Sequence, residues 1–364
     1  MAASTDSAKE YRFYIGTYTR KGSEGIYTGV LDARRGSLRL EGRPASVKNP
    51  SFLCMSPCGQ HLYSVSEVAD MGGRPTGAVS ALSLDPTGDG PVLLNSSPSG
   101  GKGPCYVSVD RTGRTVLVAN YRGGSVAALP VRPDGSLGEA ASVIQHEGSG
   151  VHPGRQEGPH AHSITVSPNN RFAYAADLGI DKLVAYRLDP EQSLLQAIPS
   201  ATPTVTPGSG PRHTAFHPSL SCAYLVNELS NTVTVFDWDA ESGGLREKQT
   251  VNTLPAGYDG ETTAADIHCT PDGKYLYASN RGHDSLAVFR ISDDDGTLTP
   301  RGHVPCGGKT PRNFAVDPSG RWLLCANQDS DNIVLFRITV ETGMLEPVGS
   351  ELTVSMPVCI HFCR

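Results

Sequence analysis

One repeated unit, present seven times, constrains the fold more than any other feature of this sequence. Each unit has a first strand, a Pro-Asp-Gly-like turn, a second strand, a polar turn, a third strand and a Gly-x-Leu-like exit. Residues 269–298 show it most plainly, and residues 55–93 are a looser copy. The exits lie on average about 51 residues apart, the spacing of propeller blades. Their leucines are Leu38, Leu93, Leu137, Leu195, Leu245, Leu298 and Leu345.

The segments between the turns alternate apolar and polar residues, as half-buried antiparallel strands do. We therefore predict an all-β fold, a seven-bladed β-propeller of four-stranded antiparallel blades. Residues 11–18 match a second strand with no first strand before them, and residues 356–362 match a first strand with no second strand after them. We expect the two ends of the chain to pair in one blade, which closes the ring and leaves no open edge.

Composition narrows the class of protein and its partners. No linker or charge run divides the 364 residues, so we predict one domain over residues 11–364 after a disordered tail, residues 1–10. The net charge of −6 argues against nucleic acid as a partner, and no apolar run reaches membrane-spanning length. Nine cysteines, an odd number without zinc-site spacing, suggest free thiols in a reducing cytoplasm. We expect a monomer or a weak homodimer.

The loop from His152 to His162 is the densest group of ionisable residues. It holds three histidines, an arginine and a glutamate within eleven residues, and its prolines and glycines indicate a shaped loop, not a helix. His160 and His162 are two apart, so on an extended backbone they point the same way. The alternative is a polar surface loop whose histidines happen to cluster.

In a propeller, the loops that enter the first strands and leave the second strands open at one end. Arginines gathered there favour anionic ligands, and a histidine with a glutamate can move protons near neutral pH. The side chains pooled at this end are Glu67, Arg122, His152, Arg155, Gln156, His160, His162, Asp177, Arg212, His213, Glu228, Arg281 and Arg312. Simpler roles remain open: turn bonds for Asn120, Asn280 and Asn327, an inter-blade bond for Asp177, and solvation for Arg122.

Several of these stretches resemble the seven-bladed lactonase family over about residues 11–363. They are the 152–162 loop, the Ser-Pro-Asn-Asn-Arg-Phe run after it, Asp177-Leu178-Gly179, Gly210-Pro211-Arg212-His213, Asn227-Glu228 and Ser279-Asn280-Arg281. The family includes the bacterial propeller-type 6-phosphogluconolactonase and the fungal 3-carboxy-cis,cis-muconate lactonizing enzyme. The resemblance implies no metal or other cofactor. A Gly-rich insertion at residues 71–77 departs from the pattern.

The resemblance implies catalytic roles for four residues, with His162 as a possible substitute for the first: His160, Arg212, Glu228 and Arg281. We expect substrate binding by Glu67, His152, Arg155, Gln156, His162, Asp177, His213 and Arg312. The leading hypothesis is metal-independent hydrolysis of an anionic sugar lactone, 6-phosphogluconolactone of the pentose phosphate pathway. Arg212 and Arg281 would hold the phosphate and the oxyanion, and Glu228 or His160 would activate water.

Three alternatives stay open. The same groups could open or close a muconolactone, with the arginines on carboxylates instead of a phosphate. A propeller can also bind a ligand or a protein without catalysis, because a fold does not fix function. Finally, Arg212 and Glu228 could form an ion pair that is only structural.

Overall fold

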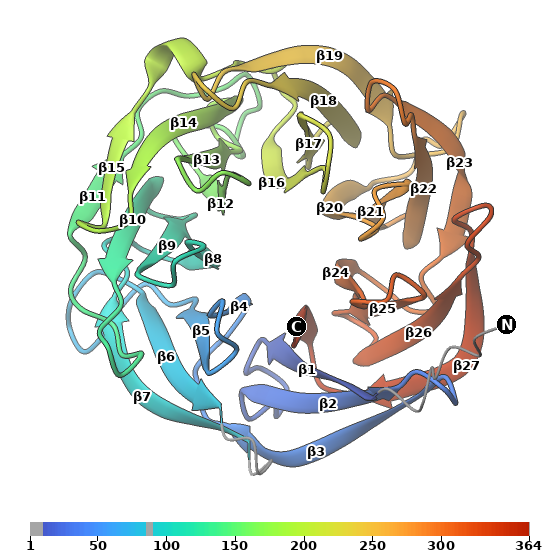
Figure 1. The fold of residues 1–364 in the computed structure, drawn as a ribbon, viewed down its shortest axis with the longest axis horizontal. Helices are drawn as coiled ribbons and strands as arrows, with labels where there is room; N and C mark the ends of the chain where they lie inside the picture. Colours follow the sequence, from blue (N-terminus) through green and yellow to red (C-terminus); the bar gives the residue numbers. More distant parts are fainter. Residues whose placement is uncertain (1–9, 85–89, 364) are drawn as a thin grey trace, which may run out of the picture.

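The computed structural model describes residues 10–84 and 90–363, which form a closed ring of seven four-stranded antiparallel sheets (Figure 1). Blade 1 contains β28 (Pro357–Phe362), β1 (Glu10–Thr17), β2 (Ile26–Asp32) and β3 (Ser37–Ala45). Blade 2 contains β4 (Leu53–Met55), β5 (His61–Ser66), β6 (Ala78–Leu84) and β7 (Pro91–Pro98). Blade 3 contains β8 (Pro104–Val109), β9 (Thr115–Asn120), β10 (Ser125–Pro130) and β11 (Ser142–Gln145).

The remaining four blades follow in chain order. Blade 4 contains β12 (Ala161–Val166), β13 (Phe172–Asp177), β14 (Lys182–Asp189) and β15 (Leu194–Ala197), followed by the 3-10 turn η1 (Pro199–Ala201). Blade 5 contains β16 (Pro211–Phe216), β17 (Cys222–Asn227), β18 (Thr232–Trp238) and β19 (Leu245–Asn252). Blade 6 contains β20 (Thr263–Cys269), β21 (Tyr275–Arg281), β22 (Ser285–Ile291) and β23 (Leu298–Pro305). Blade 7 contains β24 (Pro311–Val316), β25 (Trp322–Asn327), β26 (Asn332–Ile338) and β27 (Leu345–Thr353).

The two ends of the chain close the ring in blade 1, which confirms the predicted fold class. β28 pairs with β1 through Phe13↔Phe362 and Ile15↔Ile360, and it is the strand of that blade nearest the centre of the ring (Figure 1). Of the tail predicted at residues 1–10, residues 1–9 lie outside the described residues, and β1 begins at Glu10. The insertion at 71–77 lies between β5 and β6.

Buried aspartates organise turns between first and second strands. The Asp110 carboxylate accepts backbone N–H bonds from Thr112, Arg114 and Thr115 at 2.7–2.8 Å. Asp317 does the same in blade 7. A buried carboxylate needs such partners, and these bonds fix the turn that places the second strand beside the first.

Neighbouring blades pack through apolar side chains on both faces of each sheet and through a recurring tyrosine contact. Seven of the core clusters formed by the described residues join strands of adjacent blades; one, for example, combines Phe13 and Ile15 of blade 1 with Leu324 and Leu335 of blade 7. In addition, a second-strand tyrosine donates to a glycine carbonyl in the turn before the fourth strand of the next blade. The pairs are Tyr63–Gly135, Tyr174–Gly243, Tyr224–Gly296 and Tyr277–Gly343.

Six first strands have a register shift near their start: β28 skips Val358, β20 skips Ala265 and Asp266, and the other four each skip one residue. In β8, β12, β16 and β24 the pairing register shifts across one residue: Cys105, His162, Arg212 and Arg312, respectively. A bulge interrupts the alternation of a strand and redirects a side chain. We call these four side chains the bulge residues, because they occupy equivalent positions in blades 3, 4, 5 and 7.

Candidate active site

The site is built around Glu228, a buried carboxylate held by three arginines. Glu228 directly follows β17 and is 4% exposed. Its Oε1 lies 2.5 Å from Arg155 Nη2, and its Oε2 lies 3.1 Å from Arg212 Nε and 2.9 Å from Arg281 Nη2. The loop before β12, the bulge of β16 and the end of β21 supply these arginines, so three blades meet at one carboxylate. We call Arg155, His162, Arg212, Glu228 and Arg281 the Glu228 cluster.

The arginines are fixed by further bonds and differ in exposure. Arg212 Nη1 donates to the Ala265 carbonyl at 2.5 Å, and the Arg155 side chain, which is 36% exposed, also contacts the Tyr121 hydroxyl at 3.3 Å. Burial opposes ionisation of Glu228, but the guanidinium groups, Arg281 foremost, hold its pKa well below the ordinary value. Burial and the neighbouring cations lower the pKa of Arg212 to about 9, which leaves it charged at neutral pH. The cluster therefore carries an excess of positive charge.

His162 lies in direct contact with this charge system. Its Nε2 is 3.8 Å from Glu228 Oε2, its Nδ1 is 3.8 Å from Cys105 Sγ, and its ring meets Tyr121 edge-on at 5.3 Å. Burial, reinforced by the charge of Arg212, holds the pKa of His162 well below 6.5. At neutral pH this imidazole is neutral and able to accept a proton.

His160 contacts the same Tyr121 ring as His162 but is more exposed. It stacks on Tyr121 with ring centroids 4.7 Å apart, and its Nδ1 lies 3.0 Å from the Tyr121 carbonyl, which can only accept a hydrogen bond. Its Nε2 is 3.5 Å from the exposed Glu157 carboxylate. β12 begins after His160 and has its bulge at His162, so the simple alternation expected of these two histidines is interrupted.

Glu67 and Arg312 form a second group, from blades 2 and 7, around Tyr18 of blade 1. Glu67 Oε2 accepts hydrogen bonds from the Tyr18 hydroxyl at 2.9 Å and from the Ser51 hydroxyl at 2.6 Å. Arg312 Cζ lies 5.6 Å from the centre of the Tyr18 ring. The charge of Arg312 also acts on the Glu228 cluster, since it contributes to lowering the pKa of His162 and of Arg212.

His213 follows Arg212 on β16 and belongs to another buried network. Its Nδ1 is 2.7 Å from Asp266 Oδ1, and Asp266 Oδ2 accepts from His268 at 3.0 Å and from Asn313 at 2.5 Å. Burial, with the charge of Arg212, lowers the pKa of His213 to about 4. Its ring lies 5.2 Å from the His162 ring, so this network adjoins the Glu228 cluster.

Three other predicted substrate-binding residues lie in the scaffold of the 152–162 loop. His152 is exposed, and its Nδ1 lies 3.0 Å from the Pro153 carbonyl. Gln156 is buried and donates to the Leu178 carbonyl and to Asp181 Oδ1, each at 2.8 Å.

Asp177, the third of these, accepts from the His160 backbone N–H at 2.7 Å and lies 2.6 Å from His146 Nδ1. The contact with His146, which follows β11 of blade 3, is the inter-blade bond considered from the sequence. Asp177 thus fixes the backbone on which His160 sits.

The recurrent asparagines also have structural partners. Asn120, Asn280 and Asn327 donate side-chain bonds to carbonyls of the segments arriving from the preceding blade, at 3.0, 2.8 and 3.1 Å. Sequence reasoning did not select Tyr18, Ser51, Cys105, Tyr121 or Asp266 as site residues. Four of them occupy the repeat positions that pointed to the arginines. Tyr18 and Tyr121 directly follow second strands, and Ser51 and Cys105 lie where the chain enters first strands.

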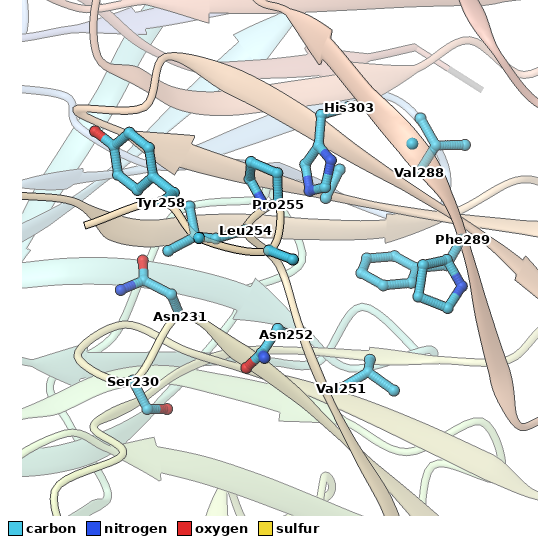
Figure 2. A pocket seen from close by; sticks show the side chains of 15 residues that line it. Ser230, Asn231, Val251, Asn252, Leu254, Pro255, Tyr258, Val288, Phe289 and His303 are labelled. Atoms are coloured by element: carbon cyan, nitrogen blue, oxygen red, sulfur yellow. The ribbon is translucent and has the colours of Figure 1, made fainter. Parts of the chain in front are cut away.

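A separate hollow of about 640 Å³ lies beside the outer strands of blades 5 and 6 (Figure 2). Asn231, Leu254, Tyr258 and His303 line it, and its lining shares no residue with the Glu228 cluster.

Within residues 10–84 and 90–363, no three His, Cys, Asp or Glu side chains are grouped to hold a metal ion. The described part of the chain also contains no helix of the length and apolarity needed to cross a bilayer.

Comparisons with known proteins agree with the fold. The family described as "Lactonase, 7-bladed beta-propeller" matches residues 12–362. A 6-phosphogluconolactonase of Bacillus subtilis is 38% identical over 353 residues, 97% of this chain and 98% of the relative. A 6-phosphogluconolactonase of Formosa agariphila is 36% identical over 84% of this chain and 86% of its own. The solved periplasmic gluconolactonase PpgL of Pseudomonas aeruginosa superposes with a TM-score of 0.91 at 36% identity, covering 98% and 99% of the two chains.

Proposed function

Because the chain belongs to the seven-bladed β-propeller lactonase family, we propose that it hydrolyses an anionic sugar lactone, 6-phosphogluconolactone, to the open-chain acid. The observation that carries this proposal is the Glu228 cluster, in which three guanidinium groups and a neutral imidazole surround one carboxylate. Such a group attracts an anion and stabilises negative charge that develops on a carbonyl oxygen.

In the proposed reaction, water adds to the lactone carbonyl carbon and the ring C–O bond then breaks. Arg155 and Arg281 are the more exposed arginines, with 36% and 14% exposed side chains, and they stabilise the tetrahedral oxyanion. His162 accepts the proton of the attacking water and returns it to the leaving ring oxygen. Glu228, 3.8 Å away, stabilises the imidazolium between these steps.

This assignment refines the hypothesis drawn from the sequence, which gave the base role to Glu228 or His160. A carboxylate that already binds three guanidinium groups is a weak base, because protonation must disrupt those ion pairs. The carboxylate that lies near His160 is that of the exposed Glu157, whereas His162 Nε2 lies 3.8 Å from Glu228 Oε2. We therefore propose His160 as a positioning residue that holds Tyr121 against Arg155.

The names of the relatives support lactone hydrolysis and give no support to the muconate reaction. The relatives are named for both phosphorylated and unphosphorylated sugar lactones. That the substrate of this protein carries a phosphate is therefore part of the proposal. We also propose a cytoplasmic location: all nine cysteines are free, and six of them are buried.

The proposal is tested by assaying the purified protein on 6-phosphogluconolactone, glucono-δ-lactone and a muconolactone, each against its spontaneous opening. We expect the phosphorylated lactone to give the highest kcat/KM. Arg281→Ala should lower that value by roughly 10²–10³-fold, the usual effect of removing one oxyanion donor. Arg301→Ala, which alters an exposed arginine on β23, is the matched control and should leave it unchanged. If the protein accelerates the opening of none of these lactones above the spontaneous rate, the proposed hydrolysis is refuted and a non-catalytic propeller is favoured.

A further inference from the structure

Arg212 and Arg312 occupy the same position in two blades but have opposite surroundings. Each is the bulge residue of its first strand and directly follows a proline. That proline pairs with the asparagine that ends the second strand of the same blade. In blade 5 the residue after that asparagine is Glu228, which binds Arg212. In blade 7 the equivalent residue is Gln328, which has no charge, and Asp329 beside it attracts Arg312 without forming an ion pair with it.

Arg312 consequently carries a guanidinium group that is not engaged. Across residues 10–84 and 90–363, no side chain or carbonyl forms a hydrogen bond or ion pair with it. Arg155, Arg212 and Arg281, by contrast, all contact Glu228. All the N–H donors of Arg312 remain available for a ligand.

The neighbours of Arg312 hold it in place without neutralising it by contact. Arg312 lies over the face of the Tyr18 ring, while Glu67 binds the Tyr18 hydroxyl at the edge of that ring. The carboxylate of Glu67 is occupied on Oε2 by Tyr18 and Ser51. Burial opposes ionisation of Arg312, but the neighbouring acidic groups of Tyr18, Glu67 and Glu228 raise its pKa, so it stays protonated at every pH of interest.

We propose that Arg312, supported by Tyr18 and Glu67, binds the phosphate of the substrate and sets the preference for phosphorylated over unphosphorylated lactones. A phosphate dianion needs several unengaged donors, and a planar guanidinium supplies two parallel ones. The arginines of the Glu228 cluster are left to the reacting carbonyl. This inference rests on the proposed hydrolysis and reassigns the phosphate from Arg212 and Arg281, where the sequence had placed it.

The test compares the unaltered enzyme with Arg312→Gln and Arg312→Lys on 6-phosphogluconolactone and on glucono-δ-lactone. We expect Arg312→Gln to lower kcat/KM for the phosphorylated lactone about 100-fold, chiefly through KM, and to change the value for glucono-δ-lactone less than about threefold. A loss of this size corresponds to one charge-assisted bidentate contact. Arg312→Lys keeps the charge but loses the planar fork, so its loss should be intermediate. Arg301→Gln is the matched control and should alter neither substrate.

Equal losses on the two lactones would overturn the inference, as would an unchanged KM for the phosphorylated one. Calorimetry with 6-phosphogluconate and with gluconate separates this inference from the proposed function. If the unaltered protein hydrolyses neither lactone, hydrolysis fails, but binding of 6-phosphogluconate that disappears in Arg312→Gln still supports the phosphate site. Binding that is the same in both proteins overturns it. Melting temperatures of the variants show whether each is folded.

Discussion

At the scale of single residues, the site depends on one carboxylate that balances more than one cation. Removing one partner from a buried ion pair is more damaging than the pair is stabilising, because the remaining charge stays buried without compensation. Glu228 forms three such ion pairs, with Arg155, Arg212 and Arg281, so its removal would leave three guanidinium groups without this partner. Stability and chemistry are therefore coupled at this residue.

We expect Glu228→Gln to lower both the melting temperature and kcat. The amide keeps the shape but leaves Arg212, 2% exposed, without its counter-ion, at a cost of about 3–5 kcal/mol. Without the carboxylate beside His162, kcat should fall roughly 10²-fold while KM changes little. Thermal melts and steady-state kinetics measure the two effects. Glu241→Gln, in an exposed pair with Arg171, should cost under about 1 kcal/mol. A lower melting temperature with intact kcat would show that Glu228 is only structural.

Buried histidines should make the protein sensitive to mild acid. Folding lowers the pKa of His213 from 6.5 to about 4 and lowers that of His162. Below pH 6.5 the unfolded chain therefore takes up protons that the folded chain does not, so the free energy of unfolding decreases as pH falls towards 4. His213 alone accounts for about 3 kcal/mol over this range. Burial opposes protonation of His268, but Asp266 raises its pKa overall, so this one histidine acts in the opposite direction.

Urea unfolding between about pH 7.5 and 4.5 measures this dependence. In His213→Gln the slope with pH should be smaller than in the unaltered protein. A free energy of unfolding that stays constant or increases between pH 6.5 and 4.5 would contradict the prediction.

At the scale of strands and turns, the repeat predicted nearly all of the elements but not the bulges. Turn residues and alternation recur along the chain, so they locate strands. A bulge depends on how two strands pair across the sheet, and its residues have no special composition: Cys105, His162, Arg212 and Arg312 are chemically unlike. The sequence could therefore identify the arginines but could not decide between His160 and His162.

The tyrosine contacts between blades should stabilise the ring at this same scale. In Tyr277→Phe the Gly343 carbonyl loses a buried partner at 2.8 Å, which should cost about 1–3 kcal/mol and lower the midpoint of chemical denaturation. Activity per folded molecule should not change, because Tyr277 lies outside the Glu228 cluster. Tyr258→Phe is the control, since this partly exposed hydroxyl forms no hydrogen bond with residues 10–84 or 90–363. Equal stability of the two variants would show that the recurring contact contributes nothing.

At the scale of the whole molecule, every blade contributes to the site. Blades 1 to 7 supply, in order, Tyr18, Glu67, Tyr121, His162, Glu228, Arg281 and Arg312. The number of blades, the closure through the chain ends and the end of the ring that holds the charged side chains were all predictable from the repeat. The Arg212–Glu228 pair, which lies within blade 5, was considered from the sequence. The contacts of Arg155 and Arg281 with the same carboxylate were not, because they join different blades.

Deleting residues 357–364 should open the ring. It removes β28, and with it the pairing of Phe13 and Ile15 and the packing of Ile360 and Phe362 between blades 1 and 7. We expect a large fall in the melting temperature and loss of activity, measured by calorimetry and by the lactone assay. Arg301→Ala, which alters an exposed side chain on β23, is the control and should have little effect. A truncated protein that melts at the original temperature would rule out closure as a source of stability.

The position of β28 in the chain also has a consequence during synthesis. Blades 2 to 7 are each continuous in sequence and can form one after another as the chain leaves the ribosome, whereas β1 must wait for a partner some 340 residues later. Until then β1 is an unpaired edge, the kind of strand that recruits a neighbouring chain on the same polysome. Tyr18, beside the Met356 carbonyl, takes its place only at that last step. A nascent lactonase therefore has no complete phosphate site until the final strand has emerged.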